Sequence, residues 1–342
     1  MRILITGAAG FIGFHLCKRL LEKGFPVFGY DELNSYYDIK LKESRLKKLY
    51  EISEKLNAEF FFEKGSIESF PSVESFFEKI RPDCVINLAA QAGVRYSLIN
   101  PFAYIQSNIV GFQNIIELSK RFNVKNFLYA SSSSVYGGNE NMPFKESSDV
   151  GHPVSIYAAT KRSNELIAHT YSNLYQLPTS GLRFFTVYGP WGRPDMALFL
   201  FTKSIIKGEK IKVFNNGEMM RDFTYIDDVV ESVMKLIDKP AESFENFNKK
   251  NPDPSKSWKP FRIFNIGNSK PTPLMKYISA IEKSLNKKAI IEFLPMQKGD
   301  VKETFADTSS LEDWISYKPR TSIEEGVQKF VDWYKDFYNI KL

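Results

Sequence analysis

A tyrosine and a lysine four residues apart form the pair in this sequence best suited to acid–base chemistry. Tyr157 and Lys161 lie in a stretch predicted to be helical, and this spacing places both side chains on one helix face. A phenol titrates near a pKa of about 10, and a neighbouring ammonium lowers that pKa by favouring the phenolate. A phenolate so placed can take the proton of a secondary alcohol during hydride transfer. Because chance pairs at this spacing are common, the interpretation needs support from elsewhere in the chain.

Three glycines near the amino terminus provide that support. Gly7, Gly10 and Gly13 follow a predicted buried strand over Ile3–Thr6 and lead into a predicted helix. Glycines at such a turn let peptide N–H groups approach a pyrophosphate at the helix amino terminus. The GxxGxxG spacing has one residue more in its first gap than the GxGxxG fingerprint. The sequence therefore predicts a dinucleotide site at this turn.

A carboxylate at the end of the second predicted strand indicates which dinucleotide binds. Asp31 follows Gly13 by 18 residues. At that position a carboxylate accepts hydrogen bonds from both ribose hydroxyls of NAD and repels the 2′-phosphate of NADP. The predicted cofactor is therefore NAD.

A run of four serines, 131–134, follows another predicted strand. Ligands of open parallel sheets bind at the carboxyl ends of the strands, and hydroxyls that are buried there need partners. This favours a ligand-binding segment over a plain polar loop.

Alternating short apolar runs and longer amphipathic segments predict the fold. The pattern indicates an α/β protein with a Rossmann-type doubly wound parallel sheet and a smaller mixed α/β domain. In the first half the predicted strands are 3–6, 27–30, 60–63, 84–88, 127–130 and 179–185, and the predicted helices are 11–23, 73–79, 105–122 and 157–175; isolated strands are predicted over 211–214, 261–266 and 289–294. We expect a cofactor-binding domain over 1–188, with returning segments near 223–237 and 261–268, and a smaller substrate-binding domain over 189–342. The polar stretch 239–260 contains four prolines and is predicted to be exposed.

Composition excludes several other classes of protein. The net charge of +6 is spread along the chain, so we expect no nucleic-acid partner. The two cysteines, Cys17 and Cys84, lie far apart, and the three histidines do not cluster, so no metal site is predicted. No apolar run reaches the roughly 18 residues that span a bilayer, and no signal peptide precedes the first strand. We therefore expect a cytoplasmic protein without membrane insertion.

Several long motifs are more specific than these patterns. They are residues 36–42, 91–97, 182–196, 221–228 and 294–301. With the tyrosine–lysine pair and the glycine turn, they resemble the extended short-chain dehydrogenases that act on nucleotide sugars, and most closely the bacterial UDP-glucuronate 4-epimerases. The similarity covers nearly the whole chain.

The resemblance implies a set of functional residues. Ser132, Tyr157 and Lys161 are the implied catalytic triad, Asn108 holds water or backbone near Lys161, and Arg221 and Asp300 contact the UDP diphosphate and ribose. The implied cofactor residues are Gly7, Gly10, Phe11, Ile12, Gly13, Asp31, Asn34, Ser66, Ile67, Leu88, Ala89, Ala90, Asn108, Tyr157, Lys161 and Phe184. The implied substrate residues are Arg95, Ser132, Ser133, Ser134, Tyr157, Thr186, Arg193, Val213, Arg221 and Asp300.

Two positions depart from the pattern of the relatives. Ser66 precedes Ile67 where relatives often have an aspartate for the adenine, and Gln297 replaces an arginine of many relatives. These departures leave the adenine contact and one diphosphate contact undefined.

Two serines indicate which reaction follows oxidation at C4. Related dehydratases and decarboxylases place acidic residues where this chain has Ser133 and Ser134, and a serine is neither an acid nor a base at neutral pH. The chain thus has the residues for oxidation without those for elimination. Epimerisation needs only that the 4-keto sugar rotates and takes the same hydride back on its other face.

The predicted reaction is the NAD-dependent interconversion of UDP-glucuronate and UDP-galacturonate. Its intermediate is a β-keto acid, and we expect Ser133, Ser134, Thr186 and Arg193 to hold its carboxylate and restrain loss of carbon dioxide. A UDP-glucose 4-epimerase, a UDP-glucuronate decarboxylase and a non-catalytic NAD-binding protein remain as alternatives. The predicted helices 105–122 and 157–175 pair across a twofold axis in relatives, which implies a homodimer.

Overall fold

The computed structural model describes residues 1–296 and 302–341, so Gln297 and Asp300 lie outside the described residues. Seven parallel strands form one sheet in the order β10-β6-β5-β4-β1-β2-β3. Their bounds are β1 Ile3–Thr6, β2 Val27–Asp31, β3 Phe60–Lys64, β4 Cys84–Asn87, β5 Asn126–Ser132, β6 Thr179–Phe184 and β10 Phe261–Ile266.

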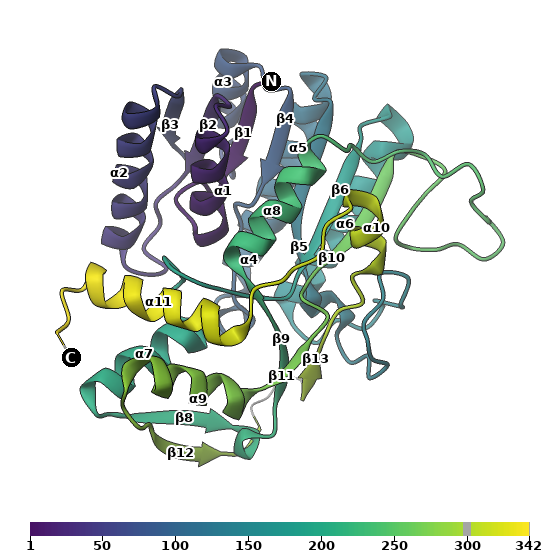
Figure 1. Ribbon diagram of the computed structural model, residues 1–342. Coiled ribbons are helices and arrows are strands. Elements are labelled where there is room, and N and C mark those ends of the chain that lie inside the picture. The colour runs from purple at the N-terminus through teal and green to yellow at the C-terminus, as the bar shows by residue number, and fades with distance from the viewer. Residues whose placement is uncertain (297–301, 342) are drawn as a thin grey trace.

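Helices cover both faces of this sheet. On one face, α1 (Phe11–Glu22) contacts α2 (Ile39–Leu56) and α8 (Ile226–Ile237), and on the other α5 (Phe112–Arg121) contacts α3 (Phe70–Ile80) and α6 (Ile156–Tyr175) (Figure 1). Successive residues of β1 enter different hydrophobic clusters, because side chains alternate between the two faces of a strand. Both faces are thus apolar, as expected for a buried parallel sheet.

The strand order defines where a ligand can bind. β1 pairs with β2 on one side and with β4 on the other, so the crossovers from these strands lead away in opposite directions. This divergence opens a crevice at the carboxyl ends of the strands. The predicted Rossmann-type α/β fold is confirmed.

The second half of the chain builds a smaller mixed layer, which Figure 1 shows below the large sheet. β9 (Met220–Tyr225) pairs with β7 (Thr186–Tyr188), β11 (Pro271–Pro273) and β13 (Glu303–Thr304), while β8 (Lys210–Phe214) pairs with β12 (Ile290–Leu294). Its helices α7 (Ala197–Lys207) and α11 (Ile323–Phe337) both contact α9 (Leu274–Leu285). The helix α10 (Ser309–Ile315) lies against β10.

Two segments differ from what the sequence pattern indicates. The predicted helix 105–122 consists of a π-helical segment, η2 (Ile105–Gly111), followed by α5, and it continues the short helix α4 (Pro101–Tyr104). The long helix α2 was not among the predicted elements. The stretch 239–260 contains no helix or strand, and most of its residues are exposed or partly exposed. Among the described residues, no helix has both the length and the apolar character that crossing a bilayer requires.

Candidate active site

A large cleft runs along the carboxyl ends of the central strands. The glycine turn and Asp31 line one part of it, and Ser132, Tyr157 and Arg193 line another. The cleft therefore brings all three predicted catalytic residues together with every predicted cofactor residue except Ser66 and Asn108.

The glycine turn is built so tightly that side chains are excluded from it. Gly7 has a φ of 71°, and its carbonyl oxygen accepts a hydrogen bond from the Gly10 N–H at 2.9 Å. A Cβ atom on Gly13 would lie 2.1 Å from the same oxygen, which no side chain tolerates. The resulting close approach of strand, turn and helix suits a pyrophosphate at the amino terminus of α1.

Asp31 both lines the cleft and fixes the turn. Its carboxylate accepts hydrogen bonds from the backbone N–H groups of Ala9, at 3.1 Å, and Leu33, at 2.9 Å. Burial raises the pKa of Asp31, while the Leu33 hydrogen bond and the charge of Lys42 oppose that rise. The carboxylate is thereby held at the position where the ribose of a dinucleotide would lie.

The catalytic residues come from two neighbouring elements. Ser132 ends β5, and its hydroxyl oxygen accepts a hydrogen bond from the Ser134 N–H at 3.1 Å. Tyr157 lies in the first turn of α6, which Ser155 caps by accepting a hydrogen bond from the Ala158 N–H. The Ser132 hydroxyl lies near the Tyr157 phenol and lowers its pKa. Because its oxygen already accepts from Ser134, the Ser132 proton can be donated towards Tyr157 or a ligand.

The electrostatics of the tyrosine differ from what the sequence indicates. Burial raises the pKa of Tyr157, and among the described groups Ser132 and Arg193 lower it. The sequence predicts that the Lys161 ammonium and a bound nicotinamide together lower this pKa, and in the protein chain by itself Lys161 is not among the groups that lower it. The Lys161 ammonium instead donates to the Ala130 carbonyl at 2.8 Å, and burial lowers the pKa of Lys161 to about 8.

Asn108 does not line the cleft, nor does it form a hydrogen bond to Lys161 in the structure. Its side chain accepts from the Gln91 N–H at 2.8 Å and donates to the Gln91 carbonyl at 3.1 Å and to the Thr160 hydroxyl at 3.0 Å. Its own carbonyl, in the π-helical segment, accepts from the Asn164 amide at 2.6 Å. Asn108 therefore fastens the segment after β4 to the catalytic helix.

Ser66 also lies outside the cleft lining, between two residues that belong to it. Gly65 and Ile67 line the cleft. The Ser66 hydroxyl oxygen accepts a hydrogen bond from the Glu68 N–H at 3.3 Å, so this side chain serves the local turn.

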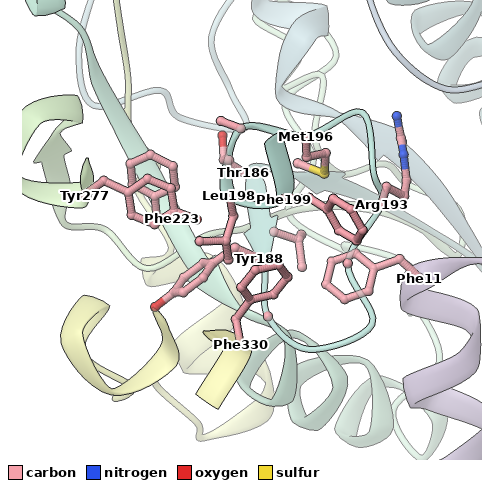
Figure 2. A pocket seen from close by; sticks show the side chains of 14 residues that line it. Phe11, Thr186, Tyr188, Arg193, Met196, Leu198, Phe199, Phe223, Tyr277 and Phe330 are labelled. Carbon is pink, nitrogen blue, oxygen red and sulfur yellow. The ribbon is translucent and has the colours of Figure 1, made fainter. Parts of the chain in front are cut away.

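The predicted substrate residues are only partly gathered in the cleft. Ser132, Tyr157 and Arg193 line it, whereas Ser133 and Ser134 form a partly buried turn after β5. Thr186 lines a smaller, mainly apolar pocket (Figure 2). Arg193 lies at the edge of that pocket, and Figure 2 shows its guanidinium directed away from the aromatic side chains.

The remaining predicted substrate residues belong to the smaller layer or its surroundings. The Arg95 guanidinium lies 5.3 Å from the centre of the Phe214 ring, and Arg221 donates to the backbone carbonyls of Met220 and Lys302. Val213 is fully buried in β8. The structure does not place these three in the cleft, and their roles stay predictions.

Several residues that line the cleft were missed by the sequence reasoning. They are Glu32, Tyr36, Tyr37, Lys42, Gly65, Gln91, Ala92, Ser107, Ala130, Ser131, Phe185, Val187 and Met196. Most lie at or just after the carboxyl ends of predicted strands, or in the quoted motifs, which was the available signal. Lys42 shows why the signal was missed: it projects from the unpredicted helix α2 and donates to the Asn34 carbonyl and side chain at 2.8 and 2.7 Å.

Comparison with known proteins identifies the family. The model of the NAD dependent epimerase/dehydratase family matches residues 3–249. The chain belongs to this family. Protein CapI of Staphylococcus aureus is 53% identical over 338 residues, which cover 99% of each chain. A probable UDP-glucuronate 4-epimerase of Rhizobium meliloti is 47% identical, with 99% of this chain and 98% of the relative covered.

Solved structures agree with this assignment. The UDP-glucuronic acid 4-epimerase of Bacillus cereus, crystallised with UDP-glucuronic acid and NAD, matches with a TM-score of 0.85 and 33% identity over 99% of this chain and 100% of that one. The UDP-glucose 4-epimerase of Thermotoga maritima, crystallised with UDP-glucose, matches with a TM-score of 0.83 and 29% identity over the same shares. The predicted family and the predicted dependence on NAD are confirmed.

Proposed function

We propose that this protein interconverts UDP-glucuronate and UDP-galacturonate at C4, using NAD through a 4-keto intermediate. One observation carries the proposal: Ser132, Tyr157 and Lys161 line the same cleft as the glycine turn and Asp31. The names of the relatives and the uronate bound in the Bacillus cereus structure support the choice of sugar.

The residues of the chain suit the chemistry that NAD supplies. The glycine turn and Asp31 would hold the dinucleotide, whose nicotinamide, when bound, takes a hydride from C4 and gives it back. The Tyr157 phenolate takes the proton of the C4 hydroxyl, and the Ser132 hydroxyl holds the C4 oxygen. Lys161 stabilises the ionised phenol, together with the cofactor's positive charge. After the keto sugar rotates and presents its opposite face for the returning hydride, Tyr157 gives the proton back to the C4 oxygen.

Arg193 is the proposed partner of the C6 carboxylate. It lines the cleft beside Tyr157, and its charge lowers the pKa of that phenol. A guanidinium recognises a carboxylate through charge-assisted hydrogen bonds. We assign Thr186, Ser133 and Ser134 as further carboxylate contacts. For the UDP moiety we assign Arg95, Val213, Arg221 and Asp300, which belong to the proposed smaller domain over 189–342 or lie beside it.

A direct assay tests the substrate. Purified protein is incubated with UDP-glucuronate or UDP-glucose, without added NAD, and the nucleotide sugars are resolved by chromatography. We expect UDP-galacturonate from the first sugar. A UDP-pentose product would indicate a decarboxylase, and far better turnover of UDP-glucose would contradict the carboxylate pocket.

We further propose that the protein acts as a homodimer in the cytoplasm. Exposed apolar side chains gather on the contiguous segments α4, η1 (Tyr96–Leu98) and α6. The largest are Leu98, Ile99, Phe102, Leu166 and Leu174, with exposed fractions of 55–79%. Such a patch favours a second copy as its cover. Light scattering should give twice the chain mass, and Phe102→Asp should halve that value.

A further inference from the structure

The loop 189–196, which carries Arg193, is attached to the cofactor side of the molecule through a buried arginine. The Arg45 guanidinium, on α2, donates to the Trp191 carbonyl at 2.6 Å and to the Ala9 carbonyl at 2.8 Å. Ala9 belongs to the glycine turn. One side chain thus joins the cofactor turn to the loop that presents Arg193.

A cation in this position needs an explanation. Arg45 is 0% exposed, and burial lowers its pKa. Its described hydrogen-bond acceptors are the two carbonyls and the Tyr37 hydroxyl, so no carboxylate compensates it directly. Burying a cation that has no carboxylate partner costs free energy, and an apolar side chain of similar volume often makes the folded state equally stable. The geometry of Arg45, with donors aimed at two separate segments, points to positioning.

A second contact from the same region reaches the other end of the loop. The Tyr36 hydroxyl donates to the Asp195 carboxylate at 3.3 Å, and Asp195 accepts from Arg193 Nε at 3.0 Å and forms a second contact with Arg193 Nη2. Burial by itself lowers the pKa of Arg193. The Asp195 carboxylate raises it by more, so that the pKa of Arg193 lies above its usual value. Arg193 is therefore held as a cation whose direction depends on Asp195.

We propose that Arg45 and Tyr36 are positioning residues that aim Arg193 at the substrate carboxylate. Arg45 fixes the backbone of the loop to the glycine turn, and Tyr36 fixes the carboxylate that orients the guanidinium. This assigns a role to Tyr36, in the motif 36–42, and to Arg45 just after that motif, and the reaction itself gives neither residue a role. The inference rests on the proposed contact between Arg193 and the uronate.

Ligand binding measures this role apart from catalysis. In protein carrying Tyr157→Phe to stop turnover, calorimetry gives the dissociation constants of UDP-glucuronate and UDP-glucose. The ratio of the two constants reports recognition of the carboxylate. Arg193→Gln should reduce the preference for the uronate by about tenfold or more, because it removes a charged hydrogen-bonding partner.

The positioning residues are then tested in the same assay. We expect Arg45→Met to reduce the uronate preference by about tenfold and Tyr36→Phe by about threefold, since each loses one contact to the loop. When either change is combined with Arg193→Gln, the preference should not fall further, because the guanidinium that these residues position is already absent. A purely structural role would weaken both ligands alike and would add to the Arg193→Gln effect.

A matched control separates the positioning of Arg193 from the general effect of removing a tyrosine hydroxyl. Tyr317→Phe removes a hydroxyl that donates to the Asp228 carboxylate at 2.7 Å, away from the cleft lining, and should leave the ratio unchanged. If Arg45→Met does not fold, Tyr36→Phe still decides the matter. An unchanged ratio in Tyr36→Phe, with a reduced one in Arg193→Gln, overturns the positioning role alone. An unchanged ratio in Arg193→Gln overturns both this inference and the proposed carboxylate contact.

Discussion

The two sides of the cleft are held in place by different means. The catalytic side is formed by the end of β5 and the start of α6, two regular elements, and a fully buried ion pair joins α6 to the neighbouring strand β6. The substrate side, at Arg193, is a loop held by hydrogen bonds from residues far away in the sequence and by aromatic packing around Trp191. The catalytic atoms are thus positioned by regular secondary structure, whereas Arg193 is positioned by contacts from distant parts of the chain.

The ion pair on the catalytic side connects the helix to the strands directly. Glu165, one turn after Lys161, accepts from Arg183 Nε at 2.8 Å and Nη2 at 3.0 Å, and from the Ser131 hydroxyl at 2.7 Å. Glu165 and Arg183 are both 0% exposed. Because Ser131 precedes the catalytic Ser132, this network fixes the spacing between β5 and the catalytic face of α6.

The largest effect should come from the catalytic side itself. Tyr157→Phe removes the acid–base group and should lower turnover of UDP-glucuronate by about 10³-fold. Chromatographic assays give the rate, and an unchanged melting temperature shows that the fold is intact. Turnover within tenfold of the wild type would remove Tyr157 from the chemistry.

The next largest effect should come from breaking the buried ion pair. Glu165→Gln leaves the Arg183 guanidinium buried without its counter-charge and should lower the free energy of unfolding by about 3–5 kcal/mol. Urea denaturation measures it. Glu325→Gln, which breaks an exposed pair with Lys329, is the matched control and should cost about 0.5 kcal/mol or less. An equal decrease in the free energy of unfolding in the two variants would mean that the buried pair stabilises the protein no more than the exposed one.

A hydrogen bond on the loop side of the cleft should make stability depend on pH. The His15 ring, on α1, donates to the Pro190 carbonyl at 2.8 Å, and burial lowers the pKa of His15 from 6.5 to about 3. The folded state therefore binds fewer protons than the unfolded state between these values, so stability falls as the pH drops below 6.5. At pH 4.5 the loss due to His15 should be about 2 kcal/mol.

The variant His15→Gln isolates this contribution, because an amide can keep the hydrogen bond but does not titrate. Denaturation curves of both proteins at pH 7 and pH 4.5 give the difference. Parallel loss of stability in wild type and variant would mean that His15 is not the titrating group.

The smallest effect should come from the edge of the catalytic network. Arg162 donates to Glu165 at 2.9 Å but has a side chain 23% exposed, so water can replace its contact. Arg162→Gln should cost about 1 kcal/mol in urea denaturation. A decrease in the free energy of unfolding as large as that of Glu165→Gln would show that the exposed and the buried members of the network contribute equally to stability.

Local signals made much of the fold and part of the site predictable. The strand–glycine–helix sequence around Gly7 to Gly13 and the helix that bears Tyr157 and Lys161 depend on turn chemistry and periodicity within short segments. The four strands predicted over 3–6, 27–30, 84–88 and 127–130 are all present, with bounds that agree within two residues. The cofactor side of the cleft follows from these elements.

Other features depended on distant contacts that short segments do not encode. The π-helical segment around Asn108 exists where Asn164 satisfies its carbonyl, and the direction of Lys161 is set by the Ala130 carbonyl. Ser133 and Ser134 directly follow the cleft residue Ser132, and Thr186 follows the cleft residue Phe185, but these three residues do not themselves line the cleft in the protein alone.

By itself the sequence determined many of the strands and helices, although not α2 or the π-helical segment, because apolar period, glycine and capping residues act within a few residues of one another. It also determined the cofactor through the glycine turn and Asp31, and the family through the long motifs together with the glycine turn and the tyrosine–lysine pair. Only the tertiary structure decided which side chains meet. Arg45 and Trp191 lie 146 positions apart, and their contact depends on the packing of α2 and the loop 189–196 around the glycine turn.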